Sequence, residues 1–262
     1  MLRFDANLTT LYGKLPLLQA LAAAKADGFD AVECRSPFAE PREKVAEALA
    51  ELGLTMVQFN CPMGDFDAGD RGIACVPGRE AEFRESIALT IDYARVLGVG
   101  QVNCVAGLRA PGASDEEIED VFVANLKFAA ARLEDAGIKL QIEPINPLDT
   151  PGVFLDTTDR FERIWERVGS DNLYLQYDFY HAQRVQGELV STFERLRSRI
   201  NHVQVADNPG RHEPGTGEIA YPFIFSELER LGYSGWVGLE YVPRTNVAEG
   251  LGWLEAYRRT AN

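Results

Sequence analysis

Short hydrophobic runs alternate with stretches of helical periodicity along the whole chain. Runs of four to six residues rich in Val, Ile, Leu, Phe and Tyr are typical of buried strands. Between them, segments such as "REKVAEALAELG" and "EFRESIALTIDYARVLG" repeat apolar positions every three or four residues, which indicates amphipathic helices. The pattern predicts strands at 3–7, 30–33, 54–59, 101–105, 138–143, 173–178, 202–206 and 236–241.

Local signals at the helix ends support this alternation. Ser114 is followed three residues later by Glu117, the spacing of a capping box that begins a helix. Glycines stand just past five predicted helices, where a left-handed residue ends a helix: Gly28, Gly53, Gly98, Gly137 and Gly232.

Eight strand–helix units without a linker favour one (β/α)₈ TIM barrel over residues 1–262, because such barrels have about 250 residues. The rival architecture is a doubly wound open sheet. It usually carries a Gly-rich phosphate loop after an early strand, and the sequence has none.

Four residues with oxygen side chains recur at the ends of successive predicted strands. Glu143 closes "IKLQIE", Asp178 closes "LYLQYD", Gln204 lies in "HVQVAD" and Glu240 closes "WVGLE", at offsets of 35, 26 and 36 residues. The C-terminal ends of all strands in a parallel barrel open onto one face, so these residues are expected to converge. Carboxylate and amide oxygens suit a hard divalent cation such as Mg²⁺ or Mn²⁺.

Three predicted connections on that face are longer than a simple turn requires. Residues 60–79, 144–156 and 207–221 follow the third, fifth and seventh strands and are rich in Gly, Pro and Asp. Long βα loops on one face usually form the substrate pocket, so we expect the active site at the C-terminal ends of the strands.

Charge and composition narrow the range of partners. The formal net charge of −14 opposes binding to nucleic acid and to anionic membranes, which favours a small-molecule substrate. No apolar run approaches the roughly 20 residues of a membrane span, and the N-terminus does not resemble a signal peptide, so a cytoplasmic location is expected. The four cysteines form no CxxC or zinc pattern and are interpreted as reduced thiols. The sequence leaves the oligomeric state open and is compatible with a homo-oligomer.

Several motifs together resemble the hydroxypyruvate isomerase family, a branch of the xylose-isomerase-like barrels. They are "HVQVADNPGRHEPGTGEIAYPFIF", "YDFYHAQRVQGEL", "GWVGLEYVPR" and the loop beginning "NCPMGDFDAGDRG". The resemblance spans nearly the whole chain. It implies a (β/α)₈ fold, a divalent metal and interconversion of hydroxypyruvate with tartronate semialdehyde. It also implies Glu143 and Glu240 as the acid/base pair, with Asp178 and Gln204 completing the metal ligands.

Chemical reasoning agrees with these roles. Moving a carbonyl to the adjacent carbon requires proton removal at one carbon and proton delivery at its neighbour, through an enediolate. Two carboxylates can serve if they differ in protonation, and a metal stabilises the developing charge. Which glutamate is the initial base stays open at this stage.

Further residues are predicted to contact the substrate. His181 follows Asp178 by three positions, while Arg211 and His212 lie in the loop after the seventh strand. An arginine suits a substrate carboxylate, because its fork of donors matches two oxygens. His202 is interpreted as structural, and Glu33 as either a site residue or a loop organiser.

Other activities of related barrels remain as alternatives. A 2-oxo-tetronate isomerase or a small ketose epimerase would use the same metal and glutamates. A metal-dependent nuclease would need several zinc-binding histidines and a basic groove, whereas this acidic chain has three histidines. A non-catalytic sugar-acid binder is opposed by the intact glutamate pair.

Overall fold

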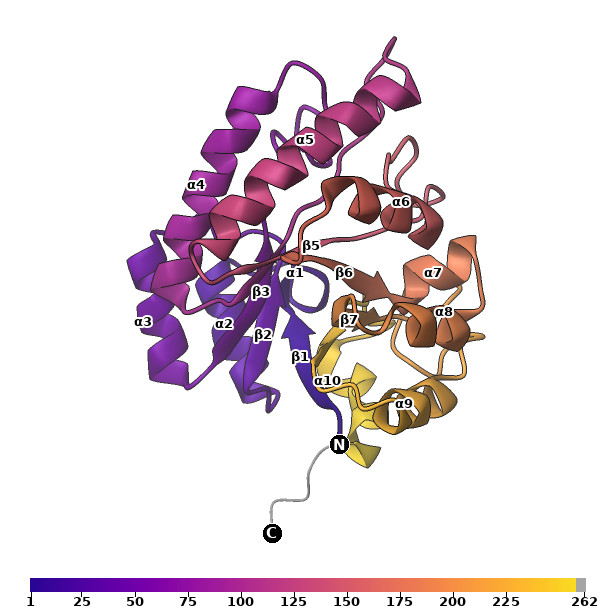
Figure 1. The fold of residues 1–262 in the computed structure, drawn as a ribbon. Coiled ribbons are helices and arrows are strands. Elements are labelled where there is room, and N and C mark those ends of the chain that lie inside the picture. The colour runs from indigo at the N-terminus through magenta and orange to yellow at the C-terminus, as the bar shows by residue number, and fades with distance from the viewer. Residues whose placement is uncertain (258–262) are drawn as a thin grey trace.

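The computed structural model describes residues 1–257 and forms a closed barrel of eight parallel strands in sequence order (Figure 1). This confirms the predicted (β/α)₈ barrel. The expectation of one domain over residues 1–262 stays a prediction, since residues 258–262 lie outside the described part. The strands are β1 (Arg3–Asn7), β2 (Ala31–Cys34), β3 (Thr55–Asn60), β4 (Gln101–Asn103), β5 (Lys139–Ile142), β6 (Leu173–Asp178), β7 (Ile200–Val205) and β8 (Trp236–Leu239).

Helices surround the barrel and pack on it through apolar stripes. In α6, Phe161, Ile164 and Val168 are buried, while Arg163 and Glu166 face solvent, which is the expected 3.6-residue periodicity. The helices are α1 (Leu8–Leu11), α2 (Leu17–Ala26), α3 (Arg42–Leu52), α4 (Glu80–Leu97), α5 (Asp115–Glu134), α6 (Thr158–Val168), α7 (Phe179–Val185), α8 (Leu189–Leu196), α9 (Tyr221–Arg230) and α10 (Val247–Gly250), followed by the 3₁₀ helix η1 (Gly252–Ala256).

The predicted helix ends agree with the structure. Ser114 is the N-cap of α5, and its hydroxyl accepts a hydrogen bond from the backbone N–H of Glu117 at 3.2 Å. Gly53 ends α3 and Gly98 ends α4 with φ of 61° and 69°, a left-handed conformation that costs glycine little. These local signals therefore set the lengths of the units that close the barrel.

Three strands are shorter than the hydrophobic pattern indicated, and the first of them, β4, ends at Asn103 instead of residue 105. β5 ends at Ile142 and β8 at Leu239, so Glu143 and Glu240 each lie one residue beyond a strand. The hydrophobic pattern does not fix the last residue of a strand, because hydrogen-bond pairing with the neighbouring strands decides where the ladder stops.

The loops after β3, β5 and β7 lie at the C-terminal ends of the strands, and in a parallel barrel these ends share one face. Backbone contacts brace the loops: Leu108 bridges to Val153, and Asp207 bridges to His212. Among residues 1–257, no helix combines the length and the apolar character that crossing a membrane would require.

Candidate active site

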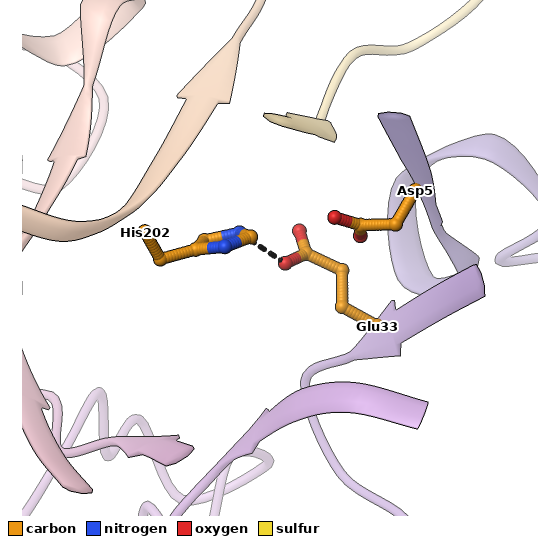
Figure 2. Close-up of side chains that lie close together, drawn as sticks. All are labelled: Asp5, Glu33 and His202. Carbon is orange, nitrogen blue, oxygen red and sulfur yellow. Dashed lines mark ion pairs between the residues drawn. The ribbon is translucent and has the colours of Figure 1, made fainter. Parts of the chain in front are cut away.

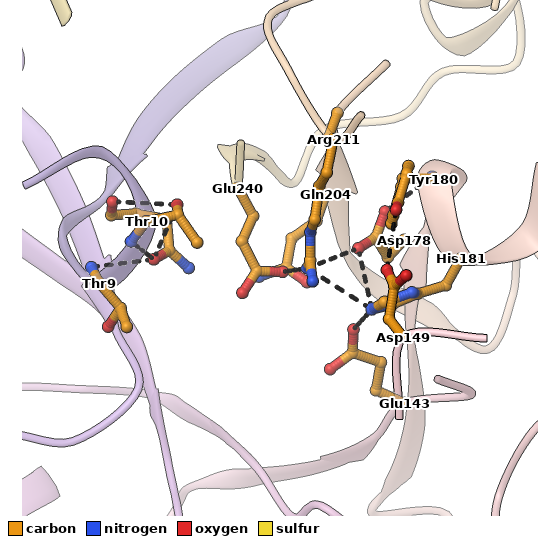
Figure 3. A network of polar contacts seen from close by, with 12 residues as sticks. Thr9, Thr10, Glu143, Asp149, Asp178, Tyr180, His181, Gln204, Arg211 and Glu240 are labelled. Carbon is orange, nitrogen blue, oxygen red and sulfur yellow. Dashed lines mark hydrogen bonds and ion pairs between the residues drawn. The ribbon is translucent and has the colours of Figure 1, made fainter. Parts of the chain in front are cut away.

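Three carboxylates converge at the C-terminal ends of β5, β6 and β8, and we call Glu143, Asp178 and Glu240 the carboxylate cup (Figure 3). Asp178 is the last residue of β6 and also the N-cap of α7, where Oδ1 accepts the Tyr180 N–H at 2.8 Å. This bond fixes the carboxylate, so its second oxygen, Oδ2, faces the cup. Oδ2 is buried and has no hydrogen-bond partner among the described residues.

His181 borders the cup, where its Nε2 lies 3.5 Å from Arg211 Nη2. Asn146 accepts the Asp149 N–H at its Oδ1 (2.9 Å), so its Nδ2 is the atom that meets His181 Nδ1 at 2.6 Å. His181 Nδ1 must then be the acceptor, which places the ring proton on Nε2. Nε2 lies 3.7 Å from Glu143 Oε1 and 3.6 Å from Asp178 Oδ2. This tautomer favours the predicted substrate contact over metal ligation.

Arg211 reaches into the cup from the loop after β7. Its Nη2 donates to Glu240 Oε2 at 2.9 Å and lies 3.6 Å from Asp178 Oδ2. The residue has a left-handed φ of 55°, which is uncommon for a side chain of this size. Its Nε is buried without a hydrogen-bond partner among the described residues, so one donor of the guanidinium is uncommitted.

Gln204 lies opposite Asp178 in the β6–β7 register and is held at both ends of its amide. Its Nε2 donates to Glu33 Oε1 at 2.7 Å, and its Oε1 accepts from Gln176 Nε2 at 2.7 Å. Gln176 Nε2 also contacts Glu143 Oε2 at 2.8 Å, and Asn103 donates to the same oxygen at 3.1 Å. Gln204 is therefore connected to Glu143 through Gln176.

A second acidic group lies inside the barrel, formed by Asp5, Glu33 and His202 (Figure 2). All three side chains are at most 1% exposed, and His202 Nε2 lies 2.7 Å from Glu33 Oε2. Both Asp5 oxygens lack a hydrogen-bond partner among the described residues, and burial with the nearby Glu33 charge raises the Asp5 pKa well above its usual value. The prediction of His202 as structural agrees with its position away from the cup.

The carboxylates of the cup hold protons more tightly than exposed ones. Burial, together with the charges of Glu240 and Asp178, raises the pKa of Glu143 well above its usual value. Burial raises the pKa of Glu240 to about 7 against the opposing effect of Arg211, and burial also raises the pKa of Asp178. Burial and the Arg211 charge lower the pKa of His181 well below its usual value, so its ring is neutral.

The cup fits a divalent cation in charge and in donor type. Three carboxylates against one guanidinium leave two negative charges when all are ionised, and the partnerless Asp178 Oδ2 is the kind of buried oxygen that a cation satisfies. Glu143, Asp178 and His181 also have ligand atoms within 4.8 Å of one another. Acidic and histidine groups that can hold a metal are thus present, and the His181 tautomer favours the two carboxylates.

His212 lies apart from the cup. Its Nδ1 contacts the Val242 carbonyl at 2.7 Å, which ties the loop after β7 to the loop after β8. The predicted substrate contact of His212 stays a prediction, and in this structure the side chain braces the rim of the barrel.

Comparison with known proteins identifies the fold family. The model of the xylose isomerase-like TIM barrel family matches residues 21–257. The chain belongs to the xylose isomerase-like TIM barrel family. It is 45% identical to the hydroxypyruvate isomerase of Escherichia coli K12, over 98% of this chain and 100% of that protein. It is 42% identical to the 2-oxo-tetronate isomerase of Cupriavidus necator, over 98% of this chain and 99% of that one.

A solved structure of this xylose isomerase-like family has nearly the same backbone. The protein is described as AP endonuclease, family 2, from Brucella melitensis, and it superposes with a TM-score of 0.95 at 38% identity, covering 99% of this chain and 100% of that chain. Because the curated relatives named above are isomerases over their full length, this member of the family is an isomerase.

Sequence reasoning missed the amides that support the site of this xylose isomerase-like barrel. A signal was present, because a glutamine stands two positions before the last polar residue in "VQFN", "LQIE" and "LQYD". These residues are Gln58, Gln141 and Gln176, and all three are buried. Asn146 carried no such signal, since it lies in a loop whose path is set by tertiary contacts.

The raised pKa of Glu240 predicts pH-dependent metal binding in this family member. A carboxylate with a pKa of about 7 is protonated at lower pH, and a proton there competes with a cation. Because burial also raises the pKa of Glu143, we expect the Mn²⁺ affinity to fall by about tenfold per pH unit or more below about pH 7, as measured by titration calorimetry. An affinity that is unchanged between about pH 8 and about pH 6 would contradict this expectation.

Proposed function

We propose that this isomerase interconverts hydroxypyruvate and 2-hydroxy-3-oxopropanoate (tartronate semialdehyde) through an enediolate. The observation that carries the proposal is the pair of carboxylates with raised pKa, Glu143 and Glu240, which enter one cup from β5 and β8. The relative from Escherichia coli, with its 45% identity over the full chain, supports the same substrate class.

Proton transfer between two adjacent carbons is the step that this pair would perform. One carboxylate removes a proton from the hydroxymethyl carbon, C3, and the electron pair forms the enediolate with the carbonyl carbon, C2. The other carboxylic acid delivers a proton to C2, and the proton of the C3 hydroxyl passes to the C2 oxygen, so that C3 becomes the aldehyde and C2 carries the hydroxyl. A raised pKa suits both halves of the step, since near neutral pH such a group can begin in either protonation state.

Glu143 and Glu240 have different partners, and the difference suggests which of them exchanges protons with solvent. Glu143 Oε2 accepts two N–H groups, from Asn103 and Gln176, which stabilise an ionised carboxylate. Glu240 Oε2 pairs with Arg211, whose guanidinium also favours ionisation. Because Glu240 has the pKa of about 7, we assign it the proton exchange with solvent during turnover.

Arg211 and His181 are proposed to bind the substrate. The uncommitted Nε–H of Arg211 is suited to the substrate carboxylate, and the Nε2–H of His181 is suited to a hydroxyl or carbonyl oxygen. We retain His212 as a third proposed contact, reached only if the loop after β7 moves.

A divalent cation, with Mg²⁺ preferred over Mn²⁺, is proposed to be held by Glu143, Asp178, Gln204 and Glu240. When bound, it would polarise the substrate carbonyl and stabilise negative charge on the enediolate oxygens. Oxygen ligands of this kind suit hard cations. Gln204 would have to exchange its Gln176 hydrogen bond for the cation, because both use Oε1.

The nuclease alternative finds little support in the site. It would need several histidine ligands, but only His181 borders the cup, while His202 is enclosed in the barrel and His212 braces a loop. An acidic cup also repels a phosphate backbone. The two relatives named above are isomerases, which also favours an isomerase over a nuclease.

A substrate panel in D₂O tests the proposal. Purified protein is supplied with Mg²⁺ and offered hydroxypyruvate, a 2-oxo-tetronate and a small ketose, and products are followed by proton NMR. We expect the highest kcat/KM with hydroxypyruvate and deuterium on the carbon that receives the proton. The highest kcat/KM with the four-carbon acid would reassign the substrate, and complete retention of the substrate hydrogen at early conversion would favour a hydride shift.

We also propose a cytoplasmic location and a small hydroxy-oxo acid as the partner of this acidic protein. All four cysteines, Cys34, Cys61, Cys75 and Cys104, are buried free thiols, which is the usual state in a reducing compartment.

A further inference from the structure

We propose that Glu33 is a positioning residue: by accepting the Nε2–H of Gln204 it makes the Gln204 oxygen, and not the nitrogen, face the carboxylate cup. The inference rests on the proposed function, in which Gln204 Oε1 is a metal ligand. It adds a residue on β2 that touches no member of the cup itself. Its hydrogen bond reaches the site through Gln204 and Gln176. Burial raises the pKa of all three carboxylates of the cup, and the negative charge of Glu33 raises it further, so the test below compares variants that restore a carboxylate at position 204.

Glu33 is built into the barrel interior by several independent features. In the β2–β3 register Val57 of β3 is skipped, so Glu33 lies opposite Gln58, the residue that donates to its carboxylate. On β8, a Cβ added at Gly238 would come within 2.7 Å of Glu33 Oε1, so the absence of a side chain there makes room for the carboxylate. With 1% of its surface exposed, Glu33 has exchanged water for protein donors.

The donors around Glu33 are committed in their orientation. Asn7 Nδ2 donates to Oε1 at 2.8 Å, and Asn7 cannot reverse because its Oδ1 caps α1 through the N–H groups of Thr9 and Thr10. Gln58 Nε2 donates to Oε2 at 2.8 Å, and Gln58 cannot reverse because its Oε1 accepts from Gln141. His202 Nε2 lies 2.7 Å from Oε2 as well, and a carboxylate, which accepts on both oxygens, matches the fixed donors Asn7 and Gln58 on its two sides.

The Glu33 carboxylate sets the orientation of the Gln204 amide. A carboxamide has one oxygen and one nitrogen, so fixing Nε2 on Glu33 at 2.7 Å leaves Oε1 directed toward Gln176 and Glu143. In the β6–β7 register Asn201 of β7 is skipped, so Gln176 lies opposite His202, and its Nε2 donates to both Gln204 and Glu143. The chain Glu33–Gln204–Gln176–Glu143 thus links the interior carboxylate to the acid/base pair.

The test measures Mn²⁺ affinity by titration calorimetry in the full chain, with wild type, Glu33→Gln and Gln58→Met. In Glu33→Gln the new amide N–H meets donors that cannot turn, and Gln204 is expected to flip its nitrogen toward the cup. We expect Mn²⁺ affinity to fall about 10–100-fold, the usual effect of losing a partner behind a metal ligand. Gln58→Met removes another donor from the same carboxylate but leaves Gln204 untouched, and its affinity is expected to stay within about threefold of wild type.

Exchanging the carboxylate of position 33 with the amide of position 204 distinguishes a positioning role of Glu33 from a general loss of structure. In Glu33→Gln/Gln204→Glu the donor and the acceptor exchange places across the same contact, so an oxygen again faces the cup. Gln204→Glu is made both in wild type and in Glu33→Gln, and its effect on the Mn²⁺ affinity is compared. We expect the increase to be at least about tenfold larger in the Glu33→Gln background. Equal effects in the two backgrounds, or equal losses in Glu33→Gln and Gln58→Met, would overturn the inference.

Melting temperatures and near-UV circular dichroism of every variant show whether it is folded. If Glu33→Gln does not fold, Glu33→Met, which also removes the acceptor of the Gln204 N–H, is measured in its place. The proposed function is scored separately, on the wild type alone. If wild type turns over no hydroxy-oxo acid, the proposed function fails, whatever the affinities. If wild type is active and binds Mn²⁺ but Glu33→Gln binds it equally well, only the positioning inference fails.

Discussion

Glu143→Gln and Glu240→Gln are each expected to lower turnover of hydroxypyruvate by roughly 10²–10⁴-fold, the usual contribution of a positioned acid or base. The reason is that an amide has nearly the shape of the carboxylate but cannot carry the proton between C3 and C2. Both residues face the same cup, and Glu143 is supported by two N–H donors that an amide oxygen can still accept. Steady-state kcat and KM of the purified variants measure the effect.

The control and the double variant sharpen this test. Glu213→Gln changes a carboxylate that accepts the Arg244 N–H outside the cup, and its turnover is expected to remain near wild type. Glu143→Gln/Glu240→Gln should be little slower than either single variant, because both residues serve one proton relay. Near-normal turnover in either single variant would remove that residue from the pair.

Removal of divalent metal is expected to abolish activity, and Mg²⁺ or Mn²⁺ is expected to restore it. The net charge of the cup and the partnerless Asp178 Oδ2 are the physical grounds for this expectation. Protein is chelated exhaustively, its metal content is checked by elemental analysis, and turnover is measured before and after each cation is added back. Full activity in verified metal-free protein would defeat the metal assignment while leaving the glutamate pair open to test.

Asp178→Asn provides the matched variant for the metal. Its Oδ1 can still accept the Tyr180 N–H, so the N-cap of α7 is expected to survive, whereas an amide nitrogen replaces the oxygen that faces the cup. The Mn²⁺ affinity is therefore expected to fall at least about tenfold, with a small change in melting temperature. Comparable losses of affinity and of fold would instead indicate a structural role for Asp178.

The positions of the cup residues followed from the sequence to within one residue of each strand end. Asp178 closes β6 as predicted, while Glu143 and Glu240 stand one residue beyond β5 and β8. This worked because strand ends, helix caps and the parallel order of a barrel depend on local periodicity and on one topological rule. The roles of the cup residues stay predictions that the experiments above address.

The state of each side chain could not be predicted in the same way. The tautomer of His181 depends on Asn146, 35 residues away, and the orientation of Gln204 depends on Glu33, 171 residues away. Arg211 was predicted to contact the substrate, and its pairing with Glu240 across the cup could not be predicted. Hydrogen bonds between such distant residues exist only after the barrel closes, so no pattern within one segment encodes them.

By itself, the sequence determined the alternation of strands and helices, the acidic character of the chain and the face on which Glu143, Asp178 and Glu240 meet. Tertiary structure decided which atoms of those residues remain uncommitted, because the hydrogen bonds of Gln176 with Glu143 and Gln204, and of Gln204 with Glu33, form only when the barrel closes. The physical reason is that periodicity is a property of neighbouring residues, whereas burial, pKa and hydrogen-bond direction are properties of the closed barrel.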